Sequence, residues 1–111
     1  MPYISITGLK PKGFFRAIQF WLLAIPSFEK ARKSKGNQFC ETKRINNYQC
    51  TLTAWDSRED MLVFFRSGVH LKAMKAFPKI ATGRTYGYEA EQLPSWAEAF
   101  TLLQEKGKEY N

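Results

Sequence analysis

The segment Thr51–Met74 (TLTAWDSREDMLVFFRSGVHLKAM) constrains the fold most, because the spacing of its apolar residues changes within it. Residues 50–55 alternate with a period of two, which is typical of a strand with two different faces. Ser57, followed three residues later by Asp60, then predicts a helix N-terminus. Gly68 interrupts the helical pattern, which resumes with the only histidine of the chain, His70. A strand therefore leads directly into a pair of helices.

The N-terminal part of the chain predicts a strand, a long apolar helix and an extended basic segment. Tyr3–Gly8 alternates as a strand. Gly13–Ile25 has apolar residues at helical spacing, and they cover nearly its whole circumference. Such a helix is usually buried on more than one side, here by a partner subunit, the C-terminal helix or a ligand pocket. Pro26 is expected to end it, and Phe28–Arg44 is expected to form two strand pieces.

The second part of the chain contains a hairpin, a last strand and a capped helix. Asn46 and Asn47 predict a two-residue turn, because Asn tolerates positive φ. Ser95 and Glu98 form an S-x-x-E capping box at the start of a helix over residues 94–107. Three further segments complete the order: a return strand at Tyr48–Trp55, a connector at Pro78–Gly83 and a strand at Gly83–Glu91.

This order of elements indicates a fold class. Strand, helix, strand, strand, helix, strand is the ferredoxin-like β-α-β-β-α-β plan of the α+β class, with an antiparallel sheet and two helices on one face. We expect a single domain over residues 1–111, with a core over 3–91 and an added C-terminal helix. The open sheet face is expected to bury Thr51, Thr53 and tyrosines such as Tyr86 and Tyr88 against a second copy, which gives a homodimer.

Net charge is concentrated in the N-terminal part. The chain carries +7 overall, and residues 1–44 hold nine Lys or Arg against two Glu, whereas the remainder is balanced. Such a segment can meet an acidic ligand, nucleic acid or a membrane. No nucleic-acid motif accompanies it, so we expect no nucleic-acid partner and favour a solvated basic edge strand.

The cysteines and the hydropathy pattern predict a cellular compartment. The two-residue turn would place Cys40 opposite Thr53 and Cys50 opposite Lys43, so the two thiols cannot meet in a disulfide. Free thiols suggest a reducing environment. The longest apolar run, Phe20–Ile25, is far shorter than a membrane span of about 20 residues. These features predict a soluble, cytoplasmic protein without a membrane span.

Several residues of the strand-to-helix segment resemble a known family. The segment LTAWDSREDMLVFFRSGVHLKAM resembles the antibiotic-biosynthesis-monooxygenase-like domains of the dimeric α+β barrel superfamily, and the resemblance covers roughly residues 3–91. The pieces FFRSGVHLKAM and LPSWAEAF are similar to an uncharacterised branch near the spheroidene-monooxygenase-like proteins. The residues that carry the family pattern are Trp55, Asp56, Ser57, Glu59, Phe65 and Ser67. The resemblance implies a dimeric α+β barrel and a possible monooxygenase-like oxidoreductase.

The chain departs from the catalytic patterns of that family. Its cofactor-independent quinone-forming members have an Asn four residues before the Trp and a Tyr six residues after it, where this chain has Thr51 and Met61. Its haem-degrading members use an Asn in the first strand, the strand Trp and a His late in the second helix. Here only Trp55 matches, because the His position falls on Met74 and His70 lies one turn earlier.

Trp55 and His70 are the candidate catalytic residues. His70 is the only side chain that ordinarily titrates near neutrality, so it could act as an acid, a base or a haem ligand. Trp55 could line a pocket between the sheet and the helices. The alternatives are a hydrogen-bonded His on an apolar helix face and a Trp that caps the core.

Four further residues are candidate ligand contacts. Phe14, Phe65 and Met74 are expected to line one cavity with the catalytic pair, between the helices and the sheet. Met74 is otherwise a common gap-filling core residue. Arg84 could hold an anionic ligand group, or pair with the nearby Glu89 or Glu91.

Two functional readings follow. With one His, a His/Cys zinc site cannot form, and no serine nucleophile motif is present. The first reading is a small oxygenase-like protein that acts on an apolar conjugated substrate in an aromatic pocket without a dedicated protein-bound metal or cofactor. The second is a non-catalytic dimer that binds an apolar ligand or haem.

Overall fold

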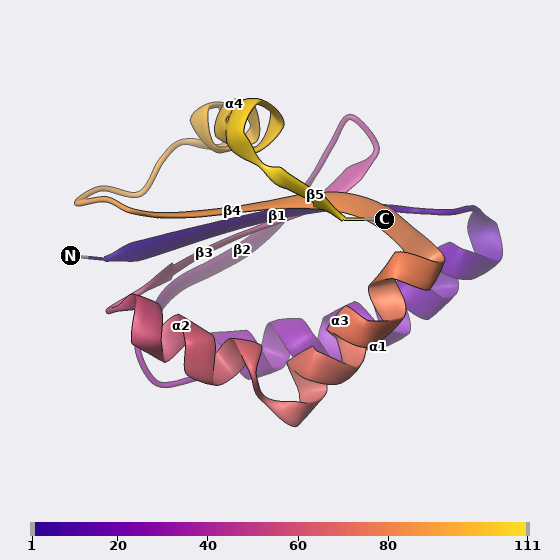
Figure 1. Ribbon diagram of the computed structural model, residues 1–111, viewed down its shortest axis with the longest axis horizontal. Coiled ribbons are helices and arrows are strands. Elements are labelled where there is room, and N and C mark those ends of the chain that lie inside the picture. Colours follow the sequence, from indigo (N-terminus) through magenta and orange to yellow (C-terminus); the bar gives the residue numbers. More distant parts are fainter. Residues whose placement is uncertain (1, 111) are drawn as a thin grey trace.

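A five-stranded antiparallel sheet lies between two layers of helices (Figure 1). The computed structural model describes residues 2–110, except for the side chains of Val69 and Tyr110. The strands are β1 (Tyr3–Pro11), β2 (Asn37–Ile45), β3 (Tyr48–Trp55), β4 (Ala81–Glu89) and β5 (Lys108–Tyr110), in the spatial order β2-β3-β1-β4-β5. The helices are α1 (Phe14–Arg32), α2 (Arg58–Phe65), α3 (Gly68–Ile80) and α4 (Trp96–Lys106). The ferredoxin-like order is confirmed, and β5 is an element that the sequence did not predict.

The two faces of the sheet carry different cores. Helices α1, α2 and α3 cover one face, and α4 lies on the other (Figure 1). The α4 face buries an aliphatic cluster made of Ile4, Ile6, Leu52, Ala54, Ala99 and Leu103. The opposite face of β1 carries Tyr3 and Leu9, which pack in the two clusters beneath α1, α2 and α3. The first strand therefore separates two cores by simple alternation.

The register of β3 places two threonines on the face opposite to the expected one. Thr53 pairs with Ser5, and Thr51 pairs with Thr7. Both lie on the same face as Tyr3 and Leu9, beneath the helices, because alternate residues of a strand point to the same side. The expectation that Thr51 and Thr53 face a second copy is therefore wrong. Tyr86 and Tyr88 do lie on the α4 face.

Helix α1 continues through Pro26 to Arg32, which corrects its expected end and the expected extended structure at residues 28–32. An interior proline removes one helical hydrogen bond. Burial of the last turns offsets this cost, because Ala31 packs against Trp55 and Phe64. Lys30 and Arg32 lie in the last turn, where cations interact favourably with the helix dipole. Neither α1 nor any other helix within residues 2–110 combines the length and apolarity needed to cross a membrane.

Serine caps begin the other helices. Ser57 accepts a hydrogen bond from the Asp60 amide at 3.2 Å, and Ser67 accepts one from the His70 amide at 3.5 Å, so Gly68 is the first residue of a new helix. The predicted capping box of Ser95 and Glu98 is confirmed. The predicted connector at residues 78–83 is wrong, because α3 runs to Ile80 and β4 begins at the next residue.

The β2–β3 hairpin has the predicted turn and register. Asn46 and Asn47 have positive φ values of 49° and 69°. Cys40 pairs with Thr53 and Cys50 with Lys43, and both cysteines are free. Burial raises the pKa of each thiol to about 11, so both are protonated at neutral pH.

Candidate functional site

A largely apolar pocket lies between α1 and the strands β2 and β3. Its volume is about 240 Å³. Helix α1 contributes an aromatic and aliphatic wall of Phe20, Trp21, Ala24, Ile25 and Phe28, and the strands contribute Thr42, Gln49, Cys50 and Thr51. We call this the α1 pocket. Its lining contains none of the six residues predicted to form the site.

The aromatic wall of the α1 pocket is anchored by Phe20. This side chain is buried, and its ring centroid lies 5.3 Å from those of both Trp21 and Phe77. Phe77 belongs to α3, so this contact joins α1 to α3, the two helices that pack side by side on this face of the sheet. The signal for this wall was present in the sequence, because α1 is apolar beyond a single stripe and such a helix needs a second apolar neighbour.

The floor of the α1 pocket is polar. Thr42 and Thr51 are register partners on adjacent strands, so their side chains share a face. Gln49 lies two residues before Thr51 on that same face. Cys50 contributes to the lining, although alternation places its thiol on the α4 face, where its Sγ is 3.9 Å from the Tyr48 carbonyl oxygen. Two hydroxyl groups and one amide can therefore hydrogen-bond a ligand whose remaining surface is apolar.

Trp55 is packed as a core residue. Its side chain is 0% exposed and stacks on Phe64, with ring centroids 5.4 Å apart. The indole Nε1 donates a hydrogen bond to Thr53 Oγ1 at 3.0 Å. This is the core-capping arrangement that was the alternative to a pocket-lining Trp. Thr53 lies between Trp55 and Thr51 along β3, so Trp55 lies near the α1 pocket but outside its lining.

His70 continues this aromatic stack. Its ring centroid lies 4.6 Å from that of Phe64 and 4.9 Å from that of Phe65. Nδ1 lies 3.1 Å from the Phe65 carbonyl oxygen, so Nδ1–H donates and Nε2 is left as an acceptor. Burial lowers the pKa of His70, and this effect outweighs the opposing hydrogen bond to the carbonyl. The imidazole is therefore neutral at pH 7.

Phe14 and Met74 lie away from that stack. The backbone amide of Lys12 bonds the Ile80 carbonyl, which places the start of α1 beside the end of α3. Trp55 instead contacts Ala31, about 25 Å further along the helix axis. Met74 packs in the cluster of Leu9, Phe20 and Phe77. The structure therefore brings Trp55, Phe65 and His70 together but leaves Phe14 at the other end of α1.

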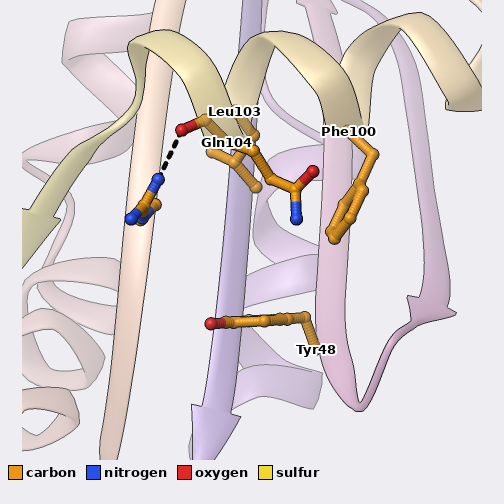
Figure 2. Close-up of a pocket in the computed structure, with 5 residues that line it drawn as sticks. Tyr48, Phe100, Leu103 and Gln104 are labelled. Atoms are coloured by element: carbon orange, nitrogen blue, oxygen red, sulfur yellow. Dashed lines mark hydrogen bonds between the residues drawn. The ribbon is translucent and has the colours of Figure 1, made fainter.

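Arg84 lies on the α4 face, where it lines a second pocket. This pocket has a volume of about 300 Å³ and is lined by Tyr48, Arg84, Phe100, Leu103 and Gln104 (Figure 2). The guanidinium donates to the Gln104 carbonyl oxygen at 2.5 Å and pairs with Glu109 of β5 at 2.5 Å. Pairing with a nearby acid was the alternative reading of Arg84, although the partner is Glu109 rather than Glu89 or Glu91.

The residues predicted to hold haem lie outside both pockets. The ring of His70 packs against those of Phe64 and Phe65, and neither His70 nor Met74 is among the residues that line the two pockets. Met74 is packed among core side chains. Within residues 2–110, no group of three or more His, Cys, Asp or Glu side chains is arranged to bind a metal ion.

Known proteins with this fold include small oxygenases. No family model and no curated protein matches the chain. The structure of Rv0793 from Mycobacterium tuberculosis matches with a TM-score of 0.76 at 12% identity, over 86% of this chain and 100% of that one. SnoaB, a cofactor-independent oxygenase from Streptomyces nogalater, matches with a TM-score of 0.67 at 14% identity, over 85% and 98% of the two chains.

A third solved structure carries the family name that the sequence suggested. A provisionally assigned antibiotic biosynthesis monooxygenase from Nitrosomonas europaea matches with a TM-score of 0.70 at 13% identity, over 81% of this chain and 99% of that one. The chain therefore has the α+β fold of the antibiotic-biosynthesis-monooxygenase-like proteins, as the resemblance implied.

Proposed function

We propose that this chain is a small oxygenase-like protein that acts on an apolar conjugated substrate in the α1 pocket. The observation that carries the proposal is the lining of that pocket. Aromatic side chains of α1 lie on one side of it, and hydroxyl and amide groups of β2 and β3 lie on the other. The shared fold with a cofactor-independent oxygenase supports the same reaction class. A flat conjugated ring would stack against Phe20, Trp21 or Phe28, because aromatic pairs add favourable contacts beyond simple burial.

The polar floor would orient the oxygen function of such a substrate. Thr42, Gln49 and Thr51 could bond a phenol or a carbonyl and hold one edge of the ring system at the sheet. Without a cofactor, all electrons that reduce dioxygen come from the substrate, so that a ring methylene group and one molecule of dioxygen give a ring carbonyl group and one molecule of water. One oxygen atom enters the product and the other leaves as water. The aromatic wall would exclude bulk water from the reacting carbon.

A blocked pocket provides the test. Ala24→Phe places a ring in the α1 pocket, and Ala97→Phe makes the same change at an exposed position of α4. We expect the wild-type protein and Ala97→Phe to bind Nile red and to consume dioxygen with members of a panel of polycyclic phenols. Ala24→Phe should lose both properties by about tenfold or more. Isotopic labelling with oxygen-18 gas should place one labelled atom in the product.

The same assay includes the predicted catalytic pair. His70→Asn keeps a donor toward the Phe65 carbonyl but removes the ring nitrogen that could accept a proton. A catalytic His70 predicts normal Nile red binding with slower oxygen consumption. Trp55→Phe tests whether the indole matters beyond packing. Rates equal to that of the wild type in both variants would contradict their assignment as catalytic residues.

A non-catalytic binding protein is the second candidate, and one observation favours it. The α1 pocket lining contains no side chain that titrates near neutrality, since its one ionisable residue, Cys50, has a protonated thiol that lies on the α4 face of the sheet. In this case the wild-type protein binds Nile red and Ala24→Phe does not, but no phenol of the panel causes the wild-type protein to consume dioxygen. If Nile red does not bind the wild-type protein, both candidates are wrong and the pocket is only a packing defect.

A further inference from the structure

The outer surface of α1 carries an unusual row of exposed apolar side chains. Its members are Phe14, Phe15, Ile18, Trp21, Leu22 and Ile25, and the largest exposed fractions include 79% at Phe15 and 70% at Leu22. Positions 14, 18, 22 and 25 recur at helical spacing, so they lie on one face. That face is opposite to the one that buries Phe20 and Ala31. We call this row the outer stripe. Contiguous apolar surface of this kind marks an interaction site.

Most charged side chains near the outer stripe are basic. Residues 10–28 contain Lys10, Lys12 and Arg16 and no acidic residue, and the acid one turn after Ile25, Glu29, pairs with Arg32 at 2.9 Å. Helix α3 packs beside α1 in the same layer (Figure 1) and has no acidic residue. It exposes three lysines, Lys72, Lys75 and Lys79. Six cations therefore lie before, on or beside the stretch of α1 that carries the stripe, and neither residues 10–28 nor α3 contains an acid to balance them.

This combination fits an anionic membrane surface better than a second copy of the chain. A two-fold interface through the outer stripe would bring its bordering cations against identical cations, because the same patch is used twice. An anionic bilayer instead offers negative headgroups to the lysines and an apolar layer to the aromatic side chains. Phe and Trp on the apolar side with Lys and Arg at its borders are typical of helices that lie in the interface.

We propose that α1 and α3 bind the surface of an anionic lipid bilayer, with α1 in the membrane plane and the outer stripe inserted among the headgroups. The lysines of α3 would contact lipid phosphates, and their aliphatic stems would cover the border of the inserted row. This function goes beyond the proposed chemistry. Trp21 and Ile25 belong both to the stripe and to the lining of the α1 pocket, so the test uses Phe15 and Leu22, which lie outside that lining.

Vesicle binding tests this proposal. Phosphatidylcholine vesicles with and without phosphatidylglycerol are incubated with the full chain at low salt and sedimented. We expect binding only to the anionic vesicles, with a blue shift of tryptophan emission as Trp21 enters the interface. Binding should weaken as salt is added, because headgroup attraction is screened.

Matched variants separate the outer stripe from other surface groups. Phe15→Ser with Leu22→Ser should weaken binding about tenfold for each residue. Lys72→Gln, Lys75→Gln and Lys79→Gln should each weaken it about fivefold. Two control variants should bind as the wild type does: Val63→Ser, at a 74% exposed position of α2, and Lys43→Gln, on β2. All of these positions except Lys43 lie on helices. Circular dichroism, which measures helical content, therefore checks that the variants remain folded.

Three outcomes would overturn the proposal. The first is no binding to anionic vesicles, and the second is equal binding by the wild type and both groups of variants. The third is a wild-type oligomer, measured by light scattering, that Phe15→Ser with Leu22→Ser converts to a smaller species. This last result would make the outer stripe an interface between copies of the chain.

Discussion

At the scale of single residues, His70 shows how packing decides what a titratable side chain can do. Phe64 and Phe65 flank its ring, and the Phe65 carbonyl accepts from Nδ1. Burial penalises the charged form, so the pKa of His70 in the folded chain is below its ordinary value of 6.5. A neutral imidazole with a free Nε2 is suited to accept a proton rather than to donate one.

This lowered pKa predicts an acid-sensitive fold. Because the unfolded chain binds the proton more readily, the contribution of His70 to the free energy of unfolding is complete above pH 6.5. It is lost as pH falls from 6.5 through the lower pKa of the folded chain. His70→Asn removes the titrating group and should flatten this part of the pH dependence. Urea unfolding of both proteins at a series of pH values measures the difference. Parallel curves across that range would show that His70 is not the group responsible.

At the scale of elements, β1 and β4 approach each other more closely than side chains usually permit. A Cβ at Gly83 would lie 2.6 Å from the Gly8 carbonyl oxygen and would collide with the Leu9 side chain. A Cβ at Gly87 would collide with the Tyr3 ring. The absence of side chains at these two glycines of β4 therefore leaves room for Leu9 and Tyr3 of β1.

Gly83→Ala should therefore destabilise the sheet. The new methyl group meets backbone as well as a side chain, and overpacking of this kind costs about 1–3 kcal/mol of unfolding free energy. Gly68→Ala is the matched control, because nothing lies within 4 Å of the added Cβ at the start of α3. That change should be neutral or stabilise the chain by up to about 1 kcal/mol. Urea unfolding of the two variants compares them, and equal stabilities would contradict the close approach.

The elements that the sequence predicted well are those with local chemistry. The turn at Asn46 and Asn47 needs residues that tolerate positive φ, and the capping box of Ser95 and Glu98 needs only four consecutive residues. Errors arose where distant contacts decide. Helix α1 passes Pro26 because its last turns pack against Trp55, and this contact is invisible in the local pattern. Strand β5 has only three residues, too few for a period to be recognised.

The errors in the predicted site also arose where contacts between distant parts of the chain decide the structure. The sequence predicted an aromatic pocket lined by Trp55, His70, Phe14, Phe65 and Met74, and the lining of the α1 pocket contains none of them. Alternation along β3 separates Thr51 and Thr53 from Leu52, but it does not say which set lies under the helices. Phe14 and Trp55 were expected together because both adjoin helix ends, yet they lie at opposite ends of α1. These positions depend on how α1 packs on the sheet. The spacing of residues along the sequence carries no information about that packing.

At the scale of the whole molecule, the α4 face of the sheet is the surface on which we expect a second copy. Tyr86 and Tyr88 stack on this face with ring centroids 5.4 Å apart, and both are only half-buried. An isologous interface there would pair the two tyrosines with their symmetry equivalents or with α4 of the partner.

We therefore expect a homodimer, with a mass about twice the 12.9 kDa of one chain by light scattering. Tyr86→Ala with Tyr88→Ala should shift the mass toward one chain by removing aromatic contact area. Phe15→Ser with Leu22→Ser should leave the mass unchanged, because the outer stripe lies on the other side of the molecule. A monomeric wild-type protein at micromolar concentration would contradict the dimer.

The position of β1 has a consequence for synthesis of the chain. Of the five strands described, the first to be translated is the central strand of the sheet, and it pairs with both β3 and β4. Its second edge cannot be covered until α2, α3 and β4 have been translated, which takes several seconds at about 5–20 residues per second. During that interval β1 and the apolar helix α1 are without their final neighbours. Exposed apolar surface and unpaired strand edges favour aggregation, so we expect rare codons after Trp55 to lengthen this exposure and lower the yield of folded protein.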